Sequence, residues 1–521
     1  MAEKVADNSK NTETSAALKT EAAKRADNRT QRPESPVFRK FIGEDWGERP
    51  AGPTRAAVAD YLPARHLKLG RLFPGEYLVF PAGELKVRSN DTDYRFRAHC
   101  AFAHLSGLGG EREPGAVLVL RPLSEPGAEV SEAEPTHQAV LYFHPRTSRS
   151  SEEFYADSRY GEFWVGARMS SAEMSVLTGL RVKNIDSLYE DLCAGEDGAG
   201  RGIRIIREAD PQVTERISEI RSKNGLCGDP ARDYALAEAA SELRLKKDEF
   251  EISELRKAID ATGGGFTEIL RSLPRAVGHW RGERVVEGAF GAKAREEGNG
   301  LGYETIAACG NHANTLHWIG NNGPVTPGDL MLVDAGIEMD SLYTADITRT
   351  FPVSGKFSPA QREVYEAVLE AADYAFETAS RPGVRFRDVH AAAMEVITKY
   401  LEKWGMLPCS AAESLLPENQ QHRRWMPHGT SHHLGMDVHD CAQARSEMYR
   451  DALLEPGMVF TIEPGLYFRA DDLKVPPRLR GIGVRIEDDI LVTENGAQRL
   501  SENIPRTADA VENWISQTLL H

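Results

Sequence analysis

The sequence predicts a mixed α/β (α+β) protein with two globular domains, and three observations lead to this prediction. The chain has 521 residues, which exceeds the size at which a single hydrophobic core usually stops growing. Short apolar runs bounded by glycine or proline alternate with segments whose apolar residues recur at helical spacing. The composition, with 41% hydrophobic and 27% charged residues, is typical of globular domains.

Charge and cysteine usage exclude several classes of partner. Lysine and arginine number 63 against 79 acidic residues, giving a net charge of −16, so we expect no nucleic-acid partner, which would require a basic face. No run reaches the roughly 18 apolar residues of a membrane span, and the start of the chain has no apolar signal segment. The six cysteines form no C-x-x-C pair, which favours free thiols and a cytoplasmic location.

The first part of the chain predicts a tail and a small α/β domain. Residues 1–40 have almost no large apolar side chains, so we expect a disordered tail. An N-terminal α/β domain is expected over residues 41–230, with buried strands at EYLVFPAG, GAVLVLRP and QAVLYFHP. GEFWVGARMS predicts another strand, and SSAEMSVLTGL predicts an amphipathic helix.

The composition turns polar between about residues 208 and 232, which places the domain boundary near residue 230. A second domain is expected over residues 231–521, beginning with a helix in KKDEFEISELRKAIDATGGGFTEILRSL. Beyond about residue 300 the pattern predicts a series of strands with one clear helix, SPAQREVYEAVLEAADYAFETAS. In this helix Ser358 is the expected N-cap and Pro359 the first helical residue.

Two aspartates give the first indication of chemistry. In GDLMLVDAGIEMDSLYTADITRTFPV the apolar runs predict a hairpin. With its turn centred on Asp340, Asp334 and Asp346 lie directly opposite each other on one face, with Cβ atoms about 4.5–5.5 Å apart. Such a pair is destabilising unless a cation lies between the carboxylates. The alternative, two exposed aspartates at strand ends, is disfavoured for Asp334 because it follows the apolar run LMLV.

Two further acids end or interrupt apolar strands. Glu463 closes the apolar run of GMVFTIEPGLYF and precedes a proline that keeps it extended. In GVRIEDDILVT, alternation places Arg485 and Glu487 on the same face of one strand. Taken singly, Glu463 could be an acid at the protein surface, and Arg485 and Glu487 could form a salt bridge on the outer face of a sheet. Four acids in such positions together favour a shared cation site.

The segment PHGTSHHLGMDVHD, residues 427–440, carries four histidines. His428 and His432 have the spacing of the H-E-x-x-H zinc peptidases, but Gly429 replaces the glutamate and Gly-Thr-Ser is a poor helix former. A lone histidine is more often packed or solvated than a ligand. With four candidate carboxylates, one histidine would complete an oxygen-rich site for two divalent ions, a donor set that favours Mn²⁺.

Five segments of the sequence resemble motifs of the pita-bread metallopeptidases. In chain order they are LVDAG, DITRTFP, HGTSHHLGMDVHD, TIEPGLY and RIEDD. The motifs are most similar to those of the aminopeptidase P, or Xaa-Pro aminopeptidase, family. The resemblance covers about residues 235–505 and extends more loosely to the N-terminal region. It implies a C-terminal pita-bread catalytic domain with a smaller, creatinase-like N-terminal α/β domain.

The resemblance also implies roles for individual residues. Asp334 would bind one metal ion, Asp346 and Glu487 would bridge both, and His432 and Glu463 would complete the other. Glu463 would also act as general base. The remaining matches are His317 and His439, which would contact the substrate, and His428 and Arg485, which would lie close around the metals. The family usually has an aromatic residue after the ligand histidine, where this sequence has His433, and family spacing favours His432.

The function implied is hydrolysis of the N-terminal Xaa-Pro bond of peptides by a metal-bridging hydroxide. Two alternatives remain open, namely an Xaa-Pro dipeptidase (prolidase) and a non-catalytic pita-bread module that binds peptides. The second is disfavoured because such modules lose metal ligands, whereas all five are present here. The expected partners are peptides with proline at the second position, and dimers or tetramers are common among relatives.

Overall fold

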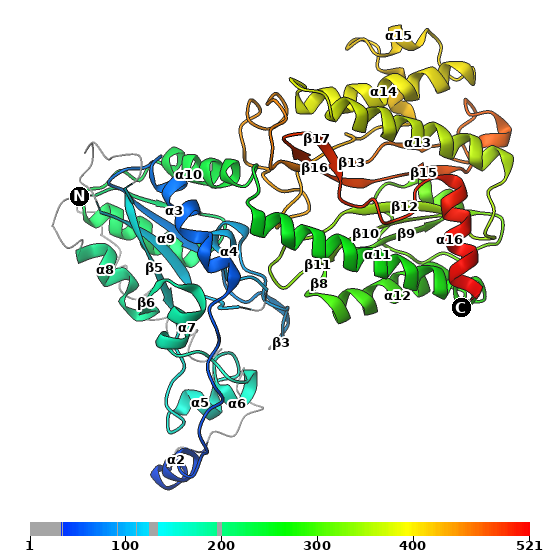
Figure 1. Ribbon diagram of the computed structural model, residues 1–521. Coiled ribbons are helices and arrows are strands. Elements are labelled where there is room, and N and C mark those ends of the chain that lie inside the picture. Colours follow the sequence, from blue (N-terminus) through cyan, green and yellow to red (C-terminus); the bar gives the residue numbers. More distant parts are fainter. Residues whose placement is uncertain are drawn as a thin grey trace, which may run out of the picture.

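The computed structural model describes residues 33, 35–90, 92–110, 112–123, 134–194 and 201–520, and it contains two domains side by side (Figure 1). Most of the predicted disordered tail lies outside the described residues. Its last part forms helix α2 (Pro36–Gly43), in which the side chain of Ser35 caps the amide of Phe38. Within the described residues no helix is both long and apolar enough to span a membrane.

The N-terminal domain is built on a mixed five-stranded sheet in the order β6-β5-β4-β1-β7. The three predicted strands are confirmed and form its centre. Strands β1 and β5 are antiparallel to β4, whereas the outer strands β7 and β6 run parallel to β1 and β5. The strand bounds are β1 Tyr77–Pro81, β4 Val117–Pro122, β5 His137–Phe143, β6 Arg181–Asn184 and β7 Ile203–Ile205.

Helices cover both faces of this sheet, which explains why its central strands are apolar throughout. One face, which includes Leu78 and Phe80, shares a core with α3 (Leu62–Gly70) and α4 (Cys100–Ser106). The other face, which includes Val79, packs against α8 (Leu188–Ala194) and α9 (Pro211–Lys223).

The strand predicted at GEFWVGARMS is wrong, because this segment contains the short helix α6 (Glu162–Val165) after α5 (Glu152–Ala156). The amides of Trp164 and Val165 both bond to the carbonyl of Gly161, so they are not available to a neighbouring strand. The predicted helix that follows is confirmed as α7 (Ser171–Thr178), which begins with a capping box between Ser170 and Glu173.

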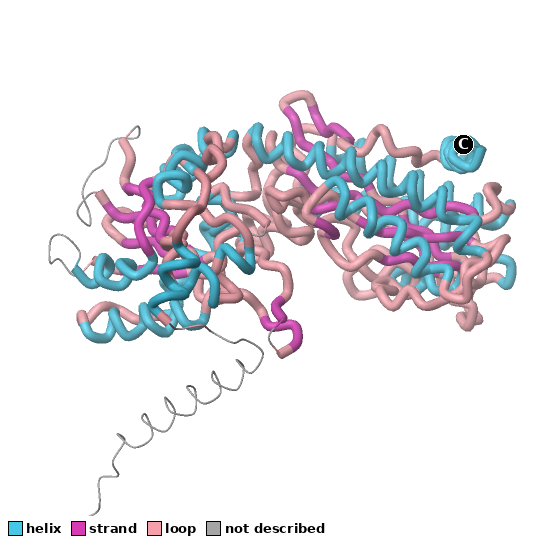
Figure 2. The backbone as a smooth tube through the Cα atoms, turned by 90° about the horizontal axis from the view of Figure 1, so that it is seen from below, coloured by secondary structure: helices cyan, strands magenta, loops and turns pink. Residues whose placement is uncertain are grey.

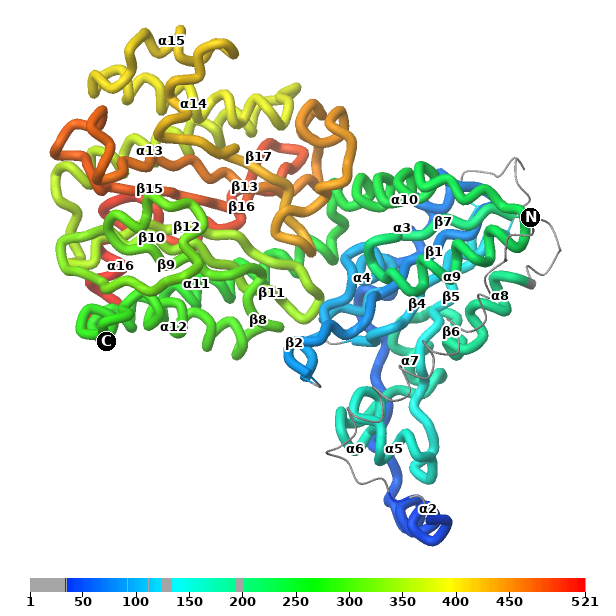
Figure 3. Tube along the Cα trace, turned by 180° about the vertical axis from the view of Figure 1, so that it is seen from behind, coloured from blue at the N-terminus to red at the C-terminus, as the bar shows by residue number. Residues whose placement is uncertain are grey.

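The second domain places small antiparallel sheets between two pairs of helices (Figures 1 and 3). Helices α11 (Glu249–Val277) and α12 (Gly282–Glu297) lie on one side, and in Figure 2, seen from that side, long helices lie in front of the strands. Helices α13 (Pro359–Ala379) and α14 (Phe386–Lys403) lie on the other side. Helix α10 (Pro230–Leu243) starts at the predicted domain boundary and contacts α3, α4 and β7 of the first domain.

Two of the sheets have three strands each, in the orders β12-β10-β9 and β13-β16-β17. The pairs β14–β15 and β8–β11 form two further sheets of two strands each. The bounds are β8 Gly300–Leu301, β9 Ile306–Cys309, β10 Leu330–Ala335, β11 Ile337–Glu338, β12 Ile347–Pro352, β13 Val459–Ile462, β14 Gly465–Tyr467, β15 Gly483–Arg485, β16 Asp488–Thr493 and β17 Gly496–Arg499.

The two helices predicted in this domain are confirmed as α11 and α13. Ser358 caps α13 by accepting from the Gln361 amide, and Pro359 is its first residue, as expected. The prediction of one clear helix beyond residue 300 was incomplete, since α14 and α16 (Ala508–Leu520) also form. Helix α14 was hidden because Arg385, which precedes it, is not a usual capping residue.

The hairpin of the two aspartates has a different register from the predicted one. Asp334 lies opposite Thr348, so Asp346 is its diagonal neighbour rather than its direct partner. The register shifts because the chain leaves β10 to form β11, which pairs with β8, and then turns at Leu342 with a positive φ of 72°. Residues two apart on a strand share a face, so both aspartates still point to the same side.

The single strand predicted for GVRIEDDILVT is also corrected, because it is divided into β15 and β16, which belong to different sheets. The break falls at Ile486 and Glu487. Their amides bond to the carbonyls of Pro464 and Thr348, which pulls the backbone towards the first sheet.

Candidate metal centre

All nine residues singled out from the sequence line one cavity of about 510 Å³ in the second domain. The aspartates come from the β10–β12 hairpin, and Glu463, Arg485 and Glu487 come from the segments around β13 to β16. The four histidines lie on loops, one after β9 and three between α14 and β13. The acids therefore lie in a strand or directly next to one, whereas the histidines lie on loops.

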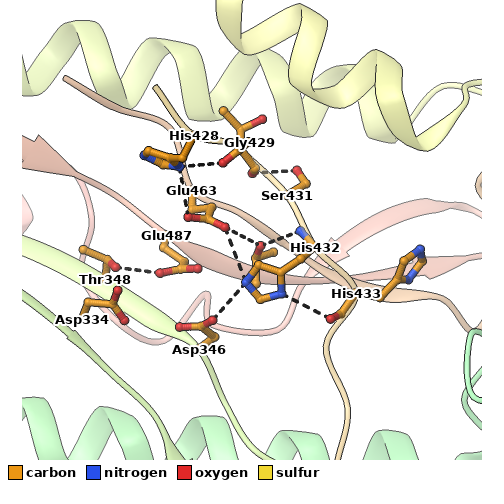
Figure 4. Close-up of polar contacts among 12 residues, drawn as sticks. Asp334, Asp346, Thr348, His428, Gly429, Ser431, His432, His433, Glu463 and Glu487 are labelled. Atoms are coloured by element: carbon orange, nitrogen blue, oxygen red, sulfur yellow. Dashed lines mark hydrogen bonds and ion pairs between the residues drawn. The ribbon is translucent and has the colours of Figure 1, made fainter. Parts of the chain in front are cut away.

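Three of the predicted metal ligands converge closely. Single donor atoms of Asp346, His432 and Glu487 all lie within 4.8 Å of one another. His432 Nε2 is 3.2 Å from Asp346 Oδ2 and 3.5 Å from Glu463 Oε1 (Figure 4). Residues far apart in the sequence thus place four potential donors around one point.

Arg485 organises the other side of the acid cluster. Its Nη2 donates to Asp334 Oδ2 at 2.5 Å, and its Nε donates to Thr348 Oγ1 at 3.1 Å. Thr348 in turn donates to Glu487 Oε2 at 2.6 Å. Arg485 thus holds one carboxylate directly and a second through a hydroxyl group.

Tyr303 and Thr348 belong to the site but were missed in the sequence. The Tyr303 hydroxyl donates to Asp334 Oδ1 at 2.7 Å and also contacts Asp346 Oδ1. Strand alternation could have found Thr348, which lies two residues after Asp346. No motif or periodicity marks Tyr303.

His428 lies beside the cluster in a chain of hydrogen bonds. Arg485 Nη1 donates to the Tyr467 hydroxyl at 3.2 Å, and this hydroxyl donates to His428 Nε2 at 2.7 Å. His428 Nδ1 then donates to the Gly429 carbonyl at 2.6 Å and lies 3.6 Å from Glu463 Oε2. Burial lowers the pKa of His428 to about 3, so this ring is neutral.

Of the adjacent pair His432 and His433, only His432 faces the acids (Figure 4). The His433 ring is fully buried and stacks on Phe386, with centroids 4.7 Å apart and planes 14° apart. His317 and His439 are exposed at the cavity wall, and the His439 ring lies edge-on to His432 at 4.5 Å.

The charges of the cavity require compensation. Burial raises the pKa of Asp346, raises that of Glu463 to about 7 and raises that of Glu487 well above its ordinary value. Burial alone would lower the pKa of His432, but the carboxylates of Asp346 and Glu463 raise it to about 9. Arg485 is the only lysine or arginine among the described residues that line the cavity. An oxygen-rich donor set with excess negative charge fits divalent cations.

Comparisons with known proteins show the family to which the chain belongs. Residues 253–494 match the model of metallopeptidase family M24, and residues 62–198 match that of the aminopeptidase P N-terminal domain. The Xaa-Pro aminopeptidase 2 of Streptomyces coelicolor is 45% identical over 462 residues, which are 89% of this chain and 92% of the relative. This chain belongs to the aminopeptidase P family of metallopeptidases.

Other members of the aminopeptidase P family give the same result. The Xaa-Pro aminopeptidase of Escherichia coli is 32% identical over 441 residues, covering 84% of this chain and 92% of the relative. A solved structure of E. coli aminopeptidase P with a histidine-to-alanine substitution has a TM-score of 0.75 at 28% identity, covering 89% of this chain and 100% of that chain. The predicted pita-bread catalytic domain with a smaller N-terminal domain is confirmed, and the chain is a metallo-aminopeptidase.

Proposed function

We propose that this metallo-aminopeptidase hydrolyses the first peptide bond of peptides whose second residue is proline. The observation that carries the proposal is the convergence of four carboxylates and His432 in one cavity that also exposes two further histidines. Two of the carboxylates, Asp346 and Glu487, are buried, and the other two, Asp334 and Glu463, are half-buried. The aminopeptidase P relatives, several of which are named Xaa-Pro aminopeptidases, support the same reaction.

We infer that five residues hold two divalent metal ions. Asp334 would contact one ion, His432 and Glu463 the other, and Asp346 and Glu487 both. The oxygen-dominated donor set supports Mn²⁺ as the metal. Ions bound there polarise the scissile carbonyl and make a water molecule acidic enough to attack it.

The protein side chains supply the proton transfer. Glu463 is the proposed general base, which accepts the proton of the attacking water and passes it to the leaving nitrogen. Burial raises the pKa of this carboxyl group above its ordinary value, which favours its uptake of a proton. His317 and His439, exposed at the cavity wall, would contact the substrate and stabilise its developing negative charge.

Specificity follows from the shape and charge of the substrate. The bond before proline is a tertiary amide without an N–H, and the ring fixes φ near −65°, so the site needs no acceptor for an amide proton. The free α-ammonium group of the substrate suits the acid-rich cluster around Asp334. Because His317, His439 and Ile319 are exposed at the cavity wall, peptides longer than two residues have room to extend past the proline.

Three finer statements belong to the same proposal. Six unpaired cysteines support a reducing, cytoplasmic location. Oligomerisation as a dimer or tetramer is proposed from the resemblance to relatives. The division into a tail (1–40), an N-terminal domain (41–230) and a catalytic domain (231–521) also stays a proposal.

A peptide panel tests the proposed function. The purified enzyme is assayed with Xaa-Pro-Yaa tripeptides, Xaa-Pro dipeptides, Xaa-Ala-Yaa peptides and N-acetylated tripeptides, each with Mn²⁺ added or with a chelator. We expect cleavage of Xaa-Pro-Yaa and longer peptides, resistance of the acetylated peptides and loss of activity on chelation. Cleavage of the dipeptides alone would favour prolidase, and equal cleavage of Xaa-Ala peptides would remove the proline specificity. Full activity without bound metal would contradict the metal mechanism.

A further inference from the structure

Glu283, at the start of α12, is a buried carboxylate outside the cavity to which no catalytic role has been given so far. Its side chain is fully buried. It accepts four hydrogen bonds, all from the segment between Cys309 and Gly323. This segment connects β9 to the strand of Asp334 and carries His317.

The four donors are spread along the whole segment. The amide of Cys309, at its start, donates to Oε1 at 2.9 Å, and the amide of Gly323, at its end, donates to Oε2 at 2.6 Å. Between them, His312 Nδ1 donates to Oε1 at 2.7 Å and Trp318 Nε1 donates to Oε2 at 2.9 Å. One side chain therefore fixes both ends and the middle of a long loop.

The close approach at the end of the loop requires glycine. A Cβ on Gly323 would lie 2.8 Å from Glu283 Oε2 and 2.6 Å from His312 Cε1, so a larger residue would displace the carboxylate. The Glu283 amide also donates to the Gly323 carbonyl at 3.1 Å. Helix α12 and the loop are thus joined by a reciprocal pair of bonds.

Trp318, the residue after His317, transmits this restraint. Its ring stacks on His312 with centroids 3.9 Å apart and packs on the small core of Ile306 and Leu332. The exposed His317 therefore lies on a backbone held by a buried carboxylate and a half-buried ring. An unrestrained loop would leave it free to sample many positions, at a cost in conformational entropy on binding.

We propose that Glu283 is the positioning residue for His317 and sets its place in the cavity without touching the substrate. This inference rests on the proposed function, in which His317 contacts the substrate. A catalytic group displaced by about 1 Å loses on the order of 100-fold in rate. The carboxylate is needed because both of its oxygens accept from two donors, and an amide would place its own NH₂ against two of them.

The test compares the wild type with Glu283→Gln, His317→Ala and the double variant on an Xaa-Pro-Yaa peptide with Mn²⁺ present. We expect Glu283→Gln to lower kcat by about 10- to 100-fold while the metal content stays that of the wild type. The double variant should be no slower than His317→Ala alone, because the positioning matters only when His317 is present.

Asp233 provides a matched control. It is equally buried and accepts from the Ile205 amide at 3.0 Å and from Arg207 and Arg221, but all of these partners belong to the N-terminal domain. Asp233→Asn should lower the melting temperature and leave kcat unchanged. A purely structural role of Glu283 would give the same result, and this outcome would overturn the proposal.

Trp318→Phe keeps the test decisive if Glu283→Gln does not fold, since it removes one donor and retains an aromatic ring. We expect about a three- to tenfold loss of kcat, again absent in the His317→Ala background. If the loss of kcat from Glu283→Gln or Trp318→Phe multiplied with the loss from His317→Ala in a double variant, the proposal would also be overturned. If the wild-type enzyme did not cleave Xaa-Pro bonds, both the proposed function and this inference would be refuted. If His317→Ala were impaired while Glu283→Gln stayed fully active, only the positioning role of Glu283 would be refuted.

Discussion

Replacing His433 by phenylalanine should leave metal binding intact and keep or raise stability, although a histidine is removed from beside the site. His433 is fully buried against Phe386 and Tyr449, with ring centroids 4.7 and 4.6 Å away. Neither of its ring nitrogens has a hydrogen-bond partner among the described residues. Burial lowers its pKa to about 3, so the ring is a neutral, aromatic core residue.

The contacts set the size of the effects. Phenylalanine keeps both ring contacts and removes two buried polar atoms, so we expect a change in the free energy of unfolding between zero and a gain of about 1 kcal/mol. His433→Ala removes the ring and leaves a cavity, which costs about 2–4 kcal/mol, and the lost aromatic pairs add about 0.5–1.5 kcal/mol. For a domain of about 250 residues each kcal/mol lowers the melting temperature by about 2–4 °C.

His432→Ala should show the opposite behaviour, with lower metal content and lower activity, because it removes a proposed ligand that faces Asp346 and Glu463. Metal per chain is measured by elemental analysis after dialysis, and unfolding is followed by urea titration in the presence of a chelator. The reasoning fails if His433→Phe loses metal, or if His432→Ala retains the metal content and activity of the wild type.

Two further predictions concern regions away from the cavity. Arg97→Met should destabilise the protein by about 1–2 kcal/mol in urea unfolding, because Arg97 donates to the buried Glu338 at 2.8 Å and to Asp437 at 3.1 Å across the domain contact. An unchanged urea midpoint would contradict this. Burial lowers the pKa of His66 to about 4, so the stability associated with its neutral ring is complete above its unfolded pKa of about 6.5 and is lost as the pH falls towards 4. At pH 5 this loss is about 2 kcal/mol of unfolding free energy in the wild type, and His66→Gln should abolish it. If the unfolding free energies of the two proteins changed in parallel with pH, the role given to His66 would be refuted.

The acids of the cavity were predictable because each one ends or interrupts an apolar strand, where an unpaired charge is expensive. That signal is local in sequence, and it survived two errors in the predicted strands. The shifted hairpin moved Asp346 by two residues relative to Asp334, which preserves the face. The divided strand changed the sheet to which Arg485 belongs but left it beside the cavity with Glu487.

The residues that support the site could not be predicted, because no such local signal in the sequence marks them. Tyr303 follows a two-residue strand, too short to show alternation, and Glu283 lies in the first turn of a helix, where an acid is common without any special role. Their partners lie elsewhere along the chain and become visible only when the loops are folded. The strand error at Trp164 has a similar origin, since whether aromatic residues form a strand depends on the presence of a neighbouring strand.

The two proposed substrate histidines, His317 and His439, both lie on loops that contain contacts to a buried carboxylate. The acids of the cavity lie in a strand or directly next to one, whereas the positions of His317 and His439 depend on what fixes their loops. Glu283 does this for His317, and Asp440, the neighbour of His439, is buried between Arg244 at 3.0 Å and Lys247 at 3.4 Å. A Cβ on Gly435 would lie 2.0 Å from the carboxylate of Asp440, just as one on Gly323 would crowd Glu283. Each loop is therefore closed around a buried carboxylate by a glycine, and a substitution at either acid should disturb substrate contacts before it disturbs metal binding.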